Sequence, residues 1–323
     1  MAKTPPTPPA HVADAKHLPL PGAGSAGVMM DYVIYNDRTK TLWVPAGNTA
    51  AVDVVDVATD KITQITGFAT KEIERRGQKR QVGPSSASLG EPGTVYVGNR
   101  GDSSVCAFDE KTFAKGVCGT LDSMPDGVTY VAKTKEVWVT TPRDKSIRIL
   151  DAATLAQKAR LAFDGEPESY AVDNQRGRFY TNLEDKDVTL SIDLASHKTV
   201  ATWPAGCGED GPHGLRLVEP DGQLVIACSA ALRTMDVMKG KVIGNVAIGD
   251  GVDDLDIDRA TRTVYAAGSD AGTLAIATLG KDGSLTLVAQ PATAQGARNG
   301  AVTEQGKFYV AHGKDGELII VKH

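Results

Sequence analysis

The sequence predicts an all-β fold, a seven-bladed β-propeller with four-stranded blades. The first observation is a hydrophobic triplet that ends a strand-like run and recurs seven times, centred on Trp43, Tyr96, Trp138, Tyr180, Val225, Tyr265 and Tyr309. The second is the spacing of the triplets, from 40 residues (Val225 to Tyr265) to 53 residues (Trp43 to Tyr96), which is the length of a propeller blade. Because one blade cannot bury both faces of its sheet, we expect residues 16–323 to form a single closed domain.

The segment before the first repeat, residues 1–15, is rich in proline and lacks an apolar signal core. It resembles the spacer that remains after a signal peptide has been removed, with Met1 added for expression. We therefore expect an N-terminal spacer at 1–15 and a periplasmic or secreted protein.

Within each repeat, the third strand is expected to end at an aspartate, in five repeats Asp56, Asp109, Asp151, Asp193 and Asp236. Such a carboxylate can accept hydrogen bonds from the backbone N–H groups of the following turn. We interpret these aspartates as structural. The sixth repeat instead has Asp282-Gly283, a common hairpin turn.

The two ends of the chain are expected to meet. The last repeat, 296–323, has room for three strands, and residues 16–22 (KHLPLPG) are expected to supply the fourth, which closes the ring and removes an exposed edge. The long first interval is explained by an insertion at 71–81 (KEIERRGQKRQ) on the face that carries the channel mouth. Its mixed charges favour a flexible, solvated loop; alternatively, its basic residues overhang the mouth and attract anions.

Composition excludes several classes of function. The net charge of −5 and the pI near 5.7 disfavour a general nucleic-acid binder, which needs a basic face. No apolar run of 18 residues occurs, so no membrane span is expected. The sequence also contains no nucleophile elbow, no HExxH and no phosphate-binding glycine loop.

The four cysteines are expected to form two local disulfides. Cys106 and Cys118 flank a turn symmetrically and would face each other across a hairpin, whereas Cys207 and Cys228 both lie on the mouth face. This pairing agrees with an oxidising compartment; four reduced, buried thiols are the alternative. There is no CxxC motif to support a zinc site.

A column of polar residues opens the innermost strand of each blade, and we call its members the ring residues: Asp31, Ser85, Asp126, Glu168, His213, Asp253 and Arg298. Because this strand lies nearest the axis, the ring residues should surround one mouth of the central channel. Either they form a site, or they are polar because the channel holds water. A second group on the same face lies at the ends of the second strands: Asn99, Arg100, Thr141, Arg143, Asn182, Cys228 and His312.

The ring residues include a possible metal site and possible catalytic groups. Asp126, Glu168, His213 and Asp253 would suit a hard divalent cation, Mg²⁺ or Ca²⁺. His213 could act as a general base beside Glu168, and Arg298 could face a substrate carboxylate or a developing oxyanion, or pair with a neighbouring acid. Clustered carboxylates repel one another, which raises their pKa values unless a cation compensates.

The residues also carry a family resemblance. The triplets VYVGN (95–99) and FYTN (179–182), the repeat length and the xDxxT turns resemble the YVTN-repeat, YncE-like seven-bladed propellers of bacteria, from His17 to His323. The stretches PESYAV, GDGVDDLDID and GARNGAV are similar to a branch loosely described as gluconolactonase-like. The resemblance implies the propeller fold; the family includes binding proteins, and related propellers include lyases that act on lactone-containing antibiotics.

Two classes of function follow. The first is a periplasmic propeller that binds a small ligand or a partner protein at the channel mouth, favoured by the lack of a catalytic motif. The second is a metal-assisted lyase or lactone hydrolase that uses the ring residues.

Overall fold

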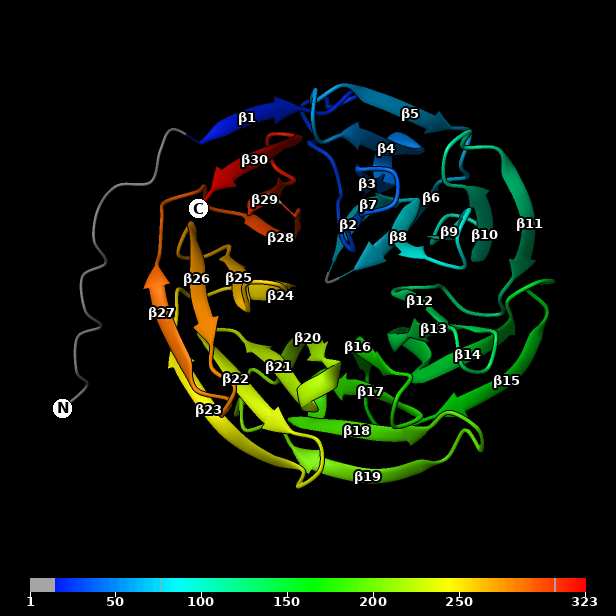
Figure 1. Ribbon diagram of the computed structural model, residues 1–323. Helices are drawn as coiled ribbons and strands as arrows, with labels where there is room; N and C mark the ends of the chain where they lie inside the picture. The colour runs from blue at the N-terminus through cyan, green and yellow to red at the C-terminus, as the bar shows by residue number, and fades with distance from the viewer. Residues whose placement is uncertain (1–14, 76, 305) are drawn as a thin grey trace.

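The computed structural model describes residues 15–75, 77–304 and 306–323, so nearly all of the expected spacer lies outside the described residues. The described residues form seven four-stranded antiparallel sheets arranged in a ring, which confirms the predicted propeller (Figure 1). No helix in the described part of the chain has the length and apolar character needed to cross a membrane.

The seven blades follow the chain in order. Blades 1 and 2 are β2 (Ile34–Asn36), β3 (Thr41–Ala46), β4 (Ala51–Asp56) and β5 (Ile62–Thr66), then β8 (Pro84–Leu89), β9 (Thr94–Asn99), β10 (Ser104–Asp109) and β11 (Lys115–Thr120). Blades 3 and 4 are β12 (Val128–Val131), β13 (Glu136–Thr141), β14 (Ser146–Asp151) and β15 (Gln157–Ala162), then β16 (Pro167–Asp173), β17 (Arg178–Leu183), β18 (Val188–Asp193) and β19 (Thr199–Pro204). Blades 5 and 6 are β20 (Pro212–Val218), β21 (Gln223–Cys228), β22 (Ala231–Asp236) and β23 (Lys241–Ala247), then β24 (Val252–Asp258), β25 (Thr263–Gly268), β26 (Thr273–Leu279) and β27 (Leu285–Ala289).

Blade 7 joins the two ends of the chain, as expected. It contains β28 (Ala297–Val302), β29 (Lys307–His312), β30 (Glu317–Lys322) and β1 (Lys16–Pro19). β1 is antiparallel to β30, with Lys16 opposite Ile320 and Pro19 opposite Glu317. The ring is therefore closed by strand pairing between residues about as far apart in sequence as the chain allows.

The core lies between the blades rather than at the axis. All seven triplet centres are buried, and Trp43 of blade 1 packs against Val95, Val97 and Phe108 of blade 2. Each sheet thereby covers the face of the next one, which is how short strands without a helical layer exclude water.

The predicted turns and disulfides are confirmed. Asp56 Oδ1 accepts hydrogen bonds from the backbone N–H groups of Ala58 and Thr59, at 3.0 and 2.8 Å. The same type of turn follows Asp109, Asp151, Asp193 and Asp236. Disulfides join Cys106 to Cys118 and Cys207 to Cys228, with Cα–Cα distances of 4.1 and 5.2 Å.

The insertion differs from the main expectation. Instead of a loop, it forms a two-stranded antiparallel hairpin, β6 (Lys71–Arg75) and β7 (Gln78–Val82). The side chains of β7 are exposed apart from Val82, which is buried at the base of the hairpin next to blade 2. Backbone pairing between the two strands satisfies the N–H and C=O groups that a solvated loop would leave to water.

Candidate functional site

The ring residues lie at the beginning of the inner strands, where strand pairing is irregular in five blades. The register between the first and second strands shifts at Pro84/Ser86, Pro167/Tyr170, Pro212/Leu215, Val252/Leu255 and Arg298/Gly300. A bulge of this kind changes the direction of a side chain relative to the ordinary alternation of a strand. The same irregularity therefore recurs at the level of the channel mouth, although the residues there differ from blade to blade.

Arg100, which follows β9, connects acids from two other blades. Its Nη2 lies 2.7 Å from Asp31 Oδ2 and also donates a hydrogen bond to Asp126 Oδ1. Tyr32 Oη donates to the other oxygen of Asp126, at 3.2 Å. Ser85 Oγ donates to the backbone carbonyl of Asp126, at 3.2 Å. One guanidinium thus compensates two of the clustered carboxylates, and nothing in the sequence distinguishes Arg100 from Arg298 for this role.

Glu168 differs from the other acids because it lacks a compensating partner. Within the described residues its carboxyl group has no hydrogen bond and no ion pair. Burial raises the pKa of Glu168 well above its ordinary value, and the negative charges of Asp126 and Glu184 raise it further. Burial likewise raises the pKa of Asp126, against the opposing effect of Arg100. The raised pKa favours the neutral form of Glu168, in which the carboxyl group can donate a proton.

His213 is held by groups from blade 4. Its Nδ1 lies 3.1 Å from Glu184 Oε1, and hydrogen bonding to this carboxylate raises the pKa of His213 although burial opposes the shift. Asn182 Nδ2 donates to the backbone carbonyl of His213, at 2.8 Å. An imidazole oriented by a carboxylate is an arrangement suited to proton transfer.

Arg298 is the most accessible charged ring residue. Its side chain is 50% exposed and lies 3.4 Å from Asp253 Oδ2. It lines a pocket of about 430 Å³, which we call the mouth pocket and which also includes Ser85. The charged residues that line the mouth pocket are Asp31, Lys79, Arg80, Arg100, Arg298 and Lys314. The hairpin β6–β7 therefore contributes two basic side chains to the site, in agreement with the alternative expectation for the insertion.

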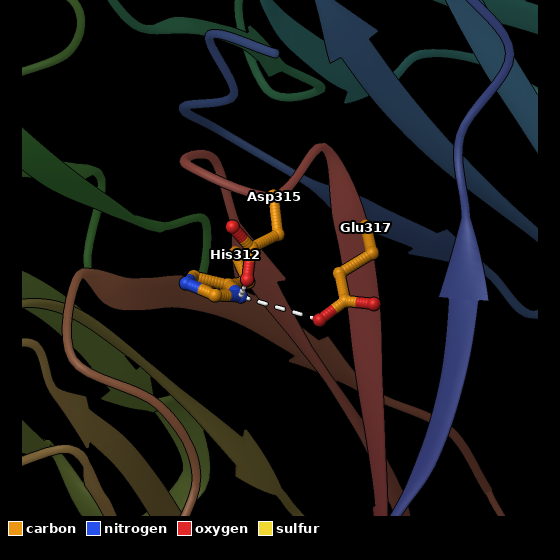
Figure 2. Close-up of side chains that lie close together, drawn as sticks. All are labelled: His312, Asp315 and Glu317. Atoms are coloured by element: carbon orange, nitrogen blue, oxygen red, sulfur yellow. Dashed lines mark hydrogen bonds and ion pairs between the residues drawn. The ribbon is translucent and has the colours of Figure 1, made fainter. Parts of the chain in front are cut away.

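Of the second group, Arg100 lines the mouth pocket, and the other six residues lie outside it: Asn99, Thr141, Arg143, Asn182, Cys228 and His312. Asn99 is buried, and its Oδ1 accepts a hydrogen bond from the backbone N–H of Gly101 at 3.0 Å, which makes it a turn residue. Arg143 is exposed on the 3₁₀ turn η2 (Pro142–Asp144). His312 is buried beside Asp315 and Glu317 in blade 7 (Figure 2).

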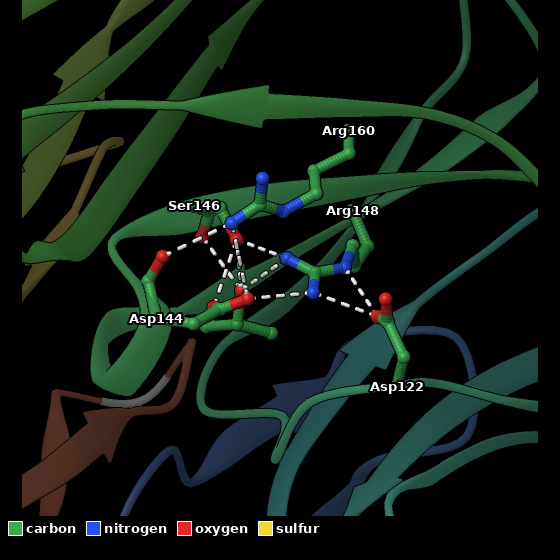
Figure 3. Close-up of polar contacts among 6 residues, drawn as sticks. Asp122, Asp144, Ser146, Arg148 and Arg160 are labelled. Atoms are coloured by element: carbon green, nitrogen blue, oxygen red, sulfur yellow. Dashed lines mark hydrogen bonds and ion pairs between the residues drawn. The ribbon is translucent and has the colours of Figure 1, made fainter.

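Arg148, Asp122 and Asp144 form a polar network between blades 2 and 3 (Figure 3), and Thr141 joins it through a hydrogen bond from Arg148. Arg148, whose side chain is 2% exposed, lies 2.7 Å from Asp122 Oδ1 and 2.6 Å from Asp144 Oδ2. Its Nη1 also donates to Thr141 Oγ1, at 3.1 Å. The guanidinium of Arg148 joins the segment that enters blade 3 to the turn that follows β13. This cluster therefore stabilises the fold and does not line the mouth pocket.

The four proposed metal ligands of the ring have other partners or none. Asp126 is bound by Arg100, Asp253 by Arg298 and His213 by Glu184, while Glu168 stands apart. Among the described residues, the one group of His, Cys, Asp and Glu whose ligand atoms all lie within 4.8 Å of one another is His312, Asp315 and Glu317. A cation at the ring remains a prediction, and it would have to draw these side chains closer together.

Sequence reasoning missed residues that act from neighbouring positions. Glu184 begins the 3₁₀ turn η3 (Glu184–Lys186) and was not singled out. Arg216, midway along β20, donates two hydrogen bonds to Asp254, at 3.0 and 2.7 Å, inside the channel. Burial raises the pKa of Asp254 to about 6, although Arg216 opposes the shift. Strand alternation alone would place Arg216, three residues after His213, on the opposite face, and the register shift between Pro212 and Leu215 is not visible in the sequence.

Three solved structures share this architecture. A chain from a structure titled "Crystal Structure of Mitotic Checkpoint Complex" is similar with a TM-score of 0.76 and 12% identity, over 100% of this chain and 98% of that one. Kuenenia stuttgartiensis hydrazine synthase is similar with a TM-score of 0.71 and 13% identity, over 93% and 96%. Virginiamycin B lyase from Staphylococcus aureus is similar with a TM-score of 0.71 and 12% identity, over 96% and 99%. At these identities the likeness establishes the propeller fold alone.

In sequence, no protein-family model matches the chain, and no curated protein matches it.

Proposed function

We propose that this chain is a YncE-like propeller that binds a small organic anion, a carboxylate in particular, in the mouth pocket. The observation that carries the proposal is the excess of basic side chains over acids there, five against one. Of the five, Arg100 is paired with Asp31 and Asp126, and Lys79 lies 2.9 Å from Glu72. Arg80 and Lys314 have no ion-pair partner within the described residues, and Arg298 has only the long contact with Asp253.

The shape and composition of the pocket also favour a small ligand. A volume of about 430 Å³ lies in the usual range of small-molecule sites. Gln81 and Ser85 add neutral polar groups for hydroxyl groups of the ligand, whereas the amide of Asn48 is bonded to the backbone at Met29 and Gly27. A guanidinium binds a carboxylate through two parallel hydrogen bonds, so Arg298 is the group expected to fix the ligand's orientation.

A periplasmic or secreted location is part of this proposal. The two disulfides support it, because disulfides persist in oxidising compartments and are rare in the cytosol.

Calorimetric titration with a series of carboxylates, from acetate to six-carbon sugar acids, and with inorganic phosphate tests the proposal. We expect the wild-type protein to bind one carboxylate per chain, more weakly at high salt. Arg298→Gln should weaken binding at least about tenfold, equivalent to about 1.4 kcal/mol. Arg143→Gln is the matched control, since Arg143 is exposed but does not line the pocket. Equal behaviour of the two variants, or no binding of any anion, would contradict the proposal.

A second candidate is a lyase or lactone hydrolase, with a metal ion as the expected aid. It is supported by two features of the ring, the buried acid Glu168, whose pKa is raised, and the imidazole of His213, which Glu184 orients. In lactone hydrolysis, His213 would take a proton from water and Glu168 would give one to the departing alkoxide, while Arg298 stabilises the oxyanion. One fold neighbour is named a lyase, virginiamycin B lyase.

Glu168 cannot be a metal ligand and a proton donor at the same time. A Mg²⁺ or Ca²⁺ ligand must be ionised, whereas a proton donor must be neutral. Lactone turnover measured with and without Mg²⁺, on wild type, His213→Ala and Glu168→Gln, therefore tests both the activity and the metal. Turnover that is absent, or that persists unchanged in both variants, would exclude this candidate.

A further inference from the structure

We propose that His17, His312, Asp315 and Glu317 bind a transition-metal ion, such as Zn²⁺, where the two ends of the chain meet. His312 is the last residue of β29, Asp315 lies in the following turn, and Glu317 begins β30 (Figure 2). His17 comes from β1, at the other end of the sequence, and its Nδ1 lies 2.8 Å from Glu317 Oε1. This site is separate from the ring and does not depend on the function proposed above.

The distances between the ligand atoms match a tetrahedral ion. Ligand atoms bound tetrahedrally at about 2.0–2.1 Å lie about 3.4 Å from one another. His312 Nδ1 lies 3.3 Å from Glu317 Oε1 and 3.6 Å from Asp315 Oδ2. The ligand atoms of these three residues all lie within 4.8 Å of one another. The two distances from His312 therefore already match the spacing of tetrahedral ligands, and Asp315 and Glu317 lie within 4.8 Å of each other.

His17 can supply the fourth corner. His17 lies outside the group of ligand atoms that are all within 4.8 Å of one another, but its side chain is 55% exposed, so a change of rotamer can bring a ring nitrogen to the site. Because Pro19 of β1 is paired with Glu317 of β30, the backbone register fixes His17 close to this site. The fourth ligand is therefore delivered by the closure of the ring.

The chemistry of the donors selects the class of ion. Two imidazoles and two carboxylates suit Zn²⁺ and similar transition metals, whereas Mg²⁺ and Ca²⁺ prefer oxygen ligands alone. Two carboxylates also balance the charge of a divalent ion. His312 is held rigidly, with its side chain 4% exposed and its residue directly opposite Glu317 in the sheet, while exposed Asp315 leaves a path for entry.

Such an ion would clip the closing strand onto the propeller. β1 has four residues and is the part of blade 7 that the chain's other end must supply. A metal bound to N-terminal and C-terminal residues together stabilises the closed ring, because it binds the folded state and not separated ends.

The experiment uses metal-free protein prepared with EDTA and titrated with Zn²⁺, Co²⁺ or Mg²⁺. We expect one Zn²⁺ per chain by calorimetry, a rise of several degrees in Tm, and intense visible absorption from tetrahedral Co²⁺ that Zn²⁺ displaces. Mg²⁺ should give none of these effects. His17→Gln and Asp315→Asn change exposed side chains and should fold normally, and each should weaken Zn²⁺ binding at least about tenfold.

The matched control is His197→Gln, because His197 Nε2 forms a similar contact with Glu136, at 3.1 Å, elsewhere in the ring. It should bind Zn²⁺ as the wild type does. The proposal is overturned if the wild type binds no Zn²⁺, if binding survives unchanged in His17→Gln and Asp315→Asn, or if His197→Gln loses it equally.

Discussion

The two faces of the propeller place carboxylates in opposite surroundings. On the face of the turns between third and fourth strands, Asp56 accepts backbone hydrogen bonds from residues two and three positions ahead, and these bonds lower its pKa. On the mouth face, burial raises the pKa of Asp126 and Glu168, and their surroundings come from other blades. A carboxylate thus stabilises the fold on the turn face, whereas burial makes the ionised form of a carboxyl group unfavourable on the mouth face.

The difference separates residues that serve folding from residues that serve a site. The turn aspartates recur with the same local partners in successive blades, as expected when the geometry of one hairpin explains them. The ring residues occupy an equally regular position, but their identities and partners differ from blade to blade. A position that recurs in every blade but carries a different residue in each is therefore a better guide to a functional site than a position where the same residue recurs.

The largest expected change in the free energy of unfolding comes from removing the positive charge of Arg100 beside Asp31 and Asp126. Arg100→Met leaves Asp31 and Asp126 close together without a cation, so we expect the free energy of unfolding to fall by about 3 kcal/mol. Urea denaturation at pH 7 measures the change. Arg143→Met is the control and should change stability little.

Adding Asp126→Asn to Arg100→Met should restore part of the loss, because one uncompensated charge is removed. If Arg100→Met behaved like its control, the mouth face would not depend on this guanidinium.

A smaller effect is expected from Glu168, and its sign depends on pH. Because the folded pKa lies above the unfolded value of about 4.5, the folded protein retains a proton that the unfolded chain releases. The free energy of unfolding therefore falls as pH rises through this window. Glu168→Gln removes that loss and should be more stable than wild type at pH 8, by on the order of 1 kcal/mol.

Denaturation curves between pH 5 and 8 measure this difference, with Glu166→Gln as control. An equal pH dependence in wild type and Glu168→Gln would mean that Glu168 is ionised normally. The proposed difference between the carboxyl groups of the two faces would then be wrong for Glu168.

The smallest effect is expected on the turn face. Asp56→Ala removes the hydrogen bonds to Ala58 and Thr59 and should lower the free energy of unfolding by roughly 0.5–1 kcal/mol at pH 7. Since the folded pKa of Asp56 is below its ordinary value of 3.8, this stabilisation is present at neutral pH and lost as pH falls through the folded pKa.

Thermal unfolding of Asp56→Ala at pH 7 and at pH 3, beside the exposed control Asp164→Ala, measures the change. Carboxylate binding at the mouth should be unaffected. Loss of ligand binding in Asp56→Ala would show that the two faces are coupled rather than independent.

The features that depend on local pattern could be predicted from the amino-acid sequence. The triplets predicted the seven blades, the aspartates predicted their turns, and the symmetric flanks of one turn predicted the Cys106–Cys118 disulfide. Closure by residues 16–22 also followed, because a three-stranded last blade leaves an edge that needs a partner. Each of these inferences needs only the period of the strand and the chemistry of a turn.

The contacts between side chains on the mouth face became visible with the folded arrangement of the blades. Asp31 and Arg100 are separated by 69 residues and meet because the closed ring places blades 1 and 2 side by side at the channel mouth. The same applies to His17 and Glu317, which come from opposite ends of the chain. Contacts between blades depend on the angle and offset of whole sheets. The sequence of one repeat therefore does not show which side chains of the neighbouring blade it will contact. The residues of the ring could therefore be named in advance, but not their partners.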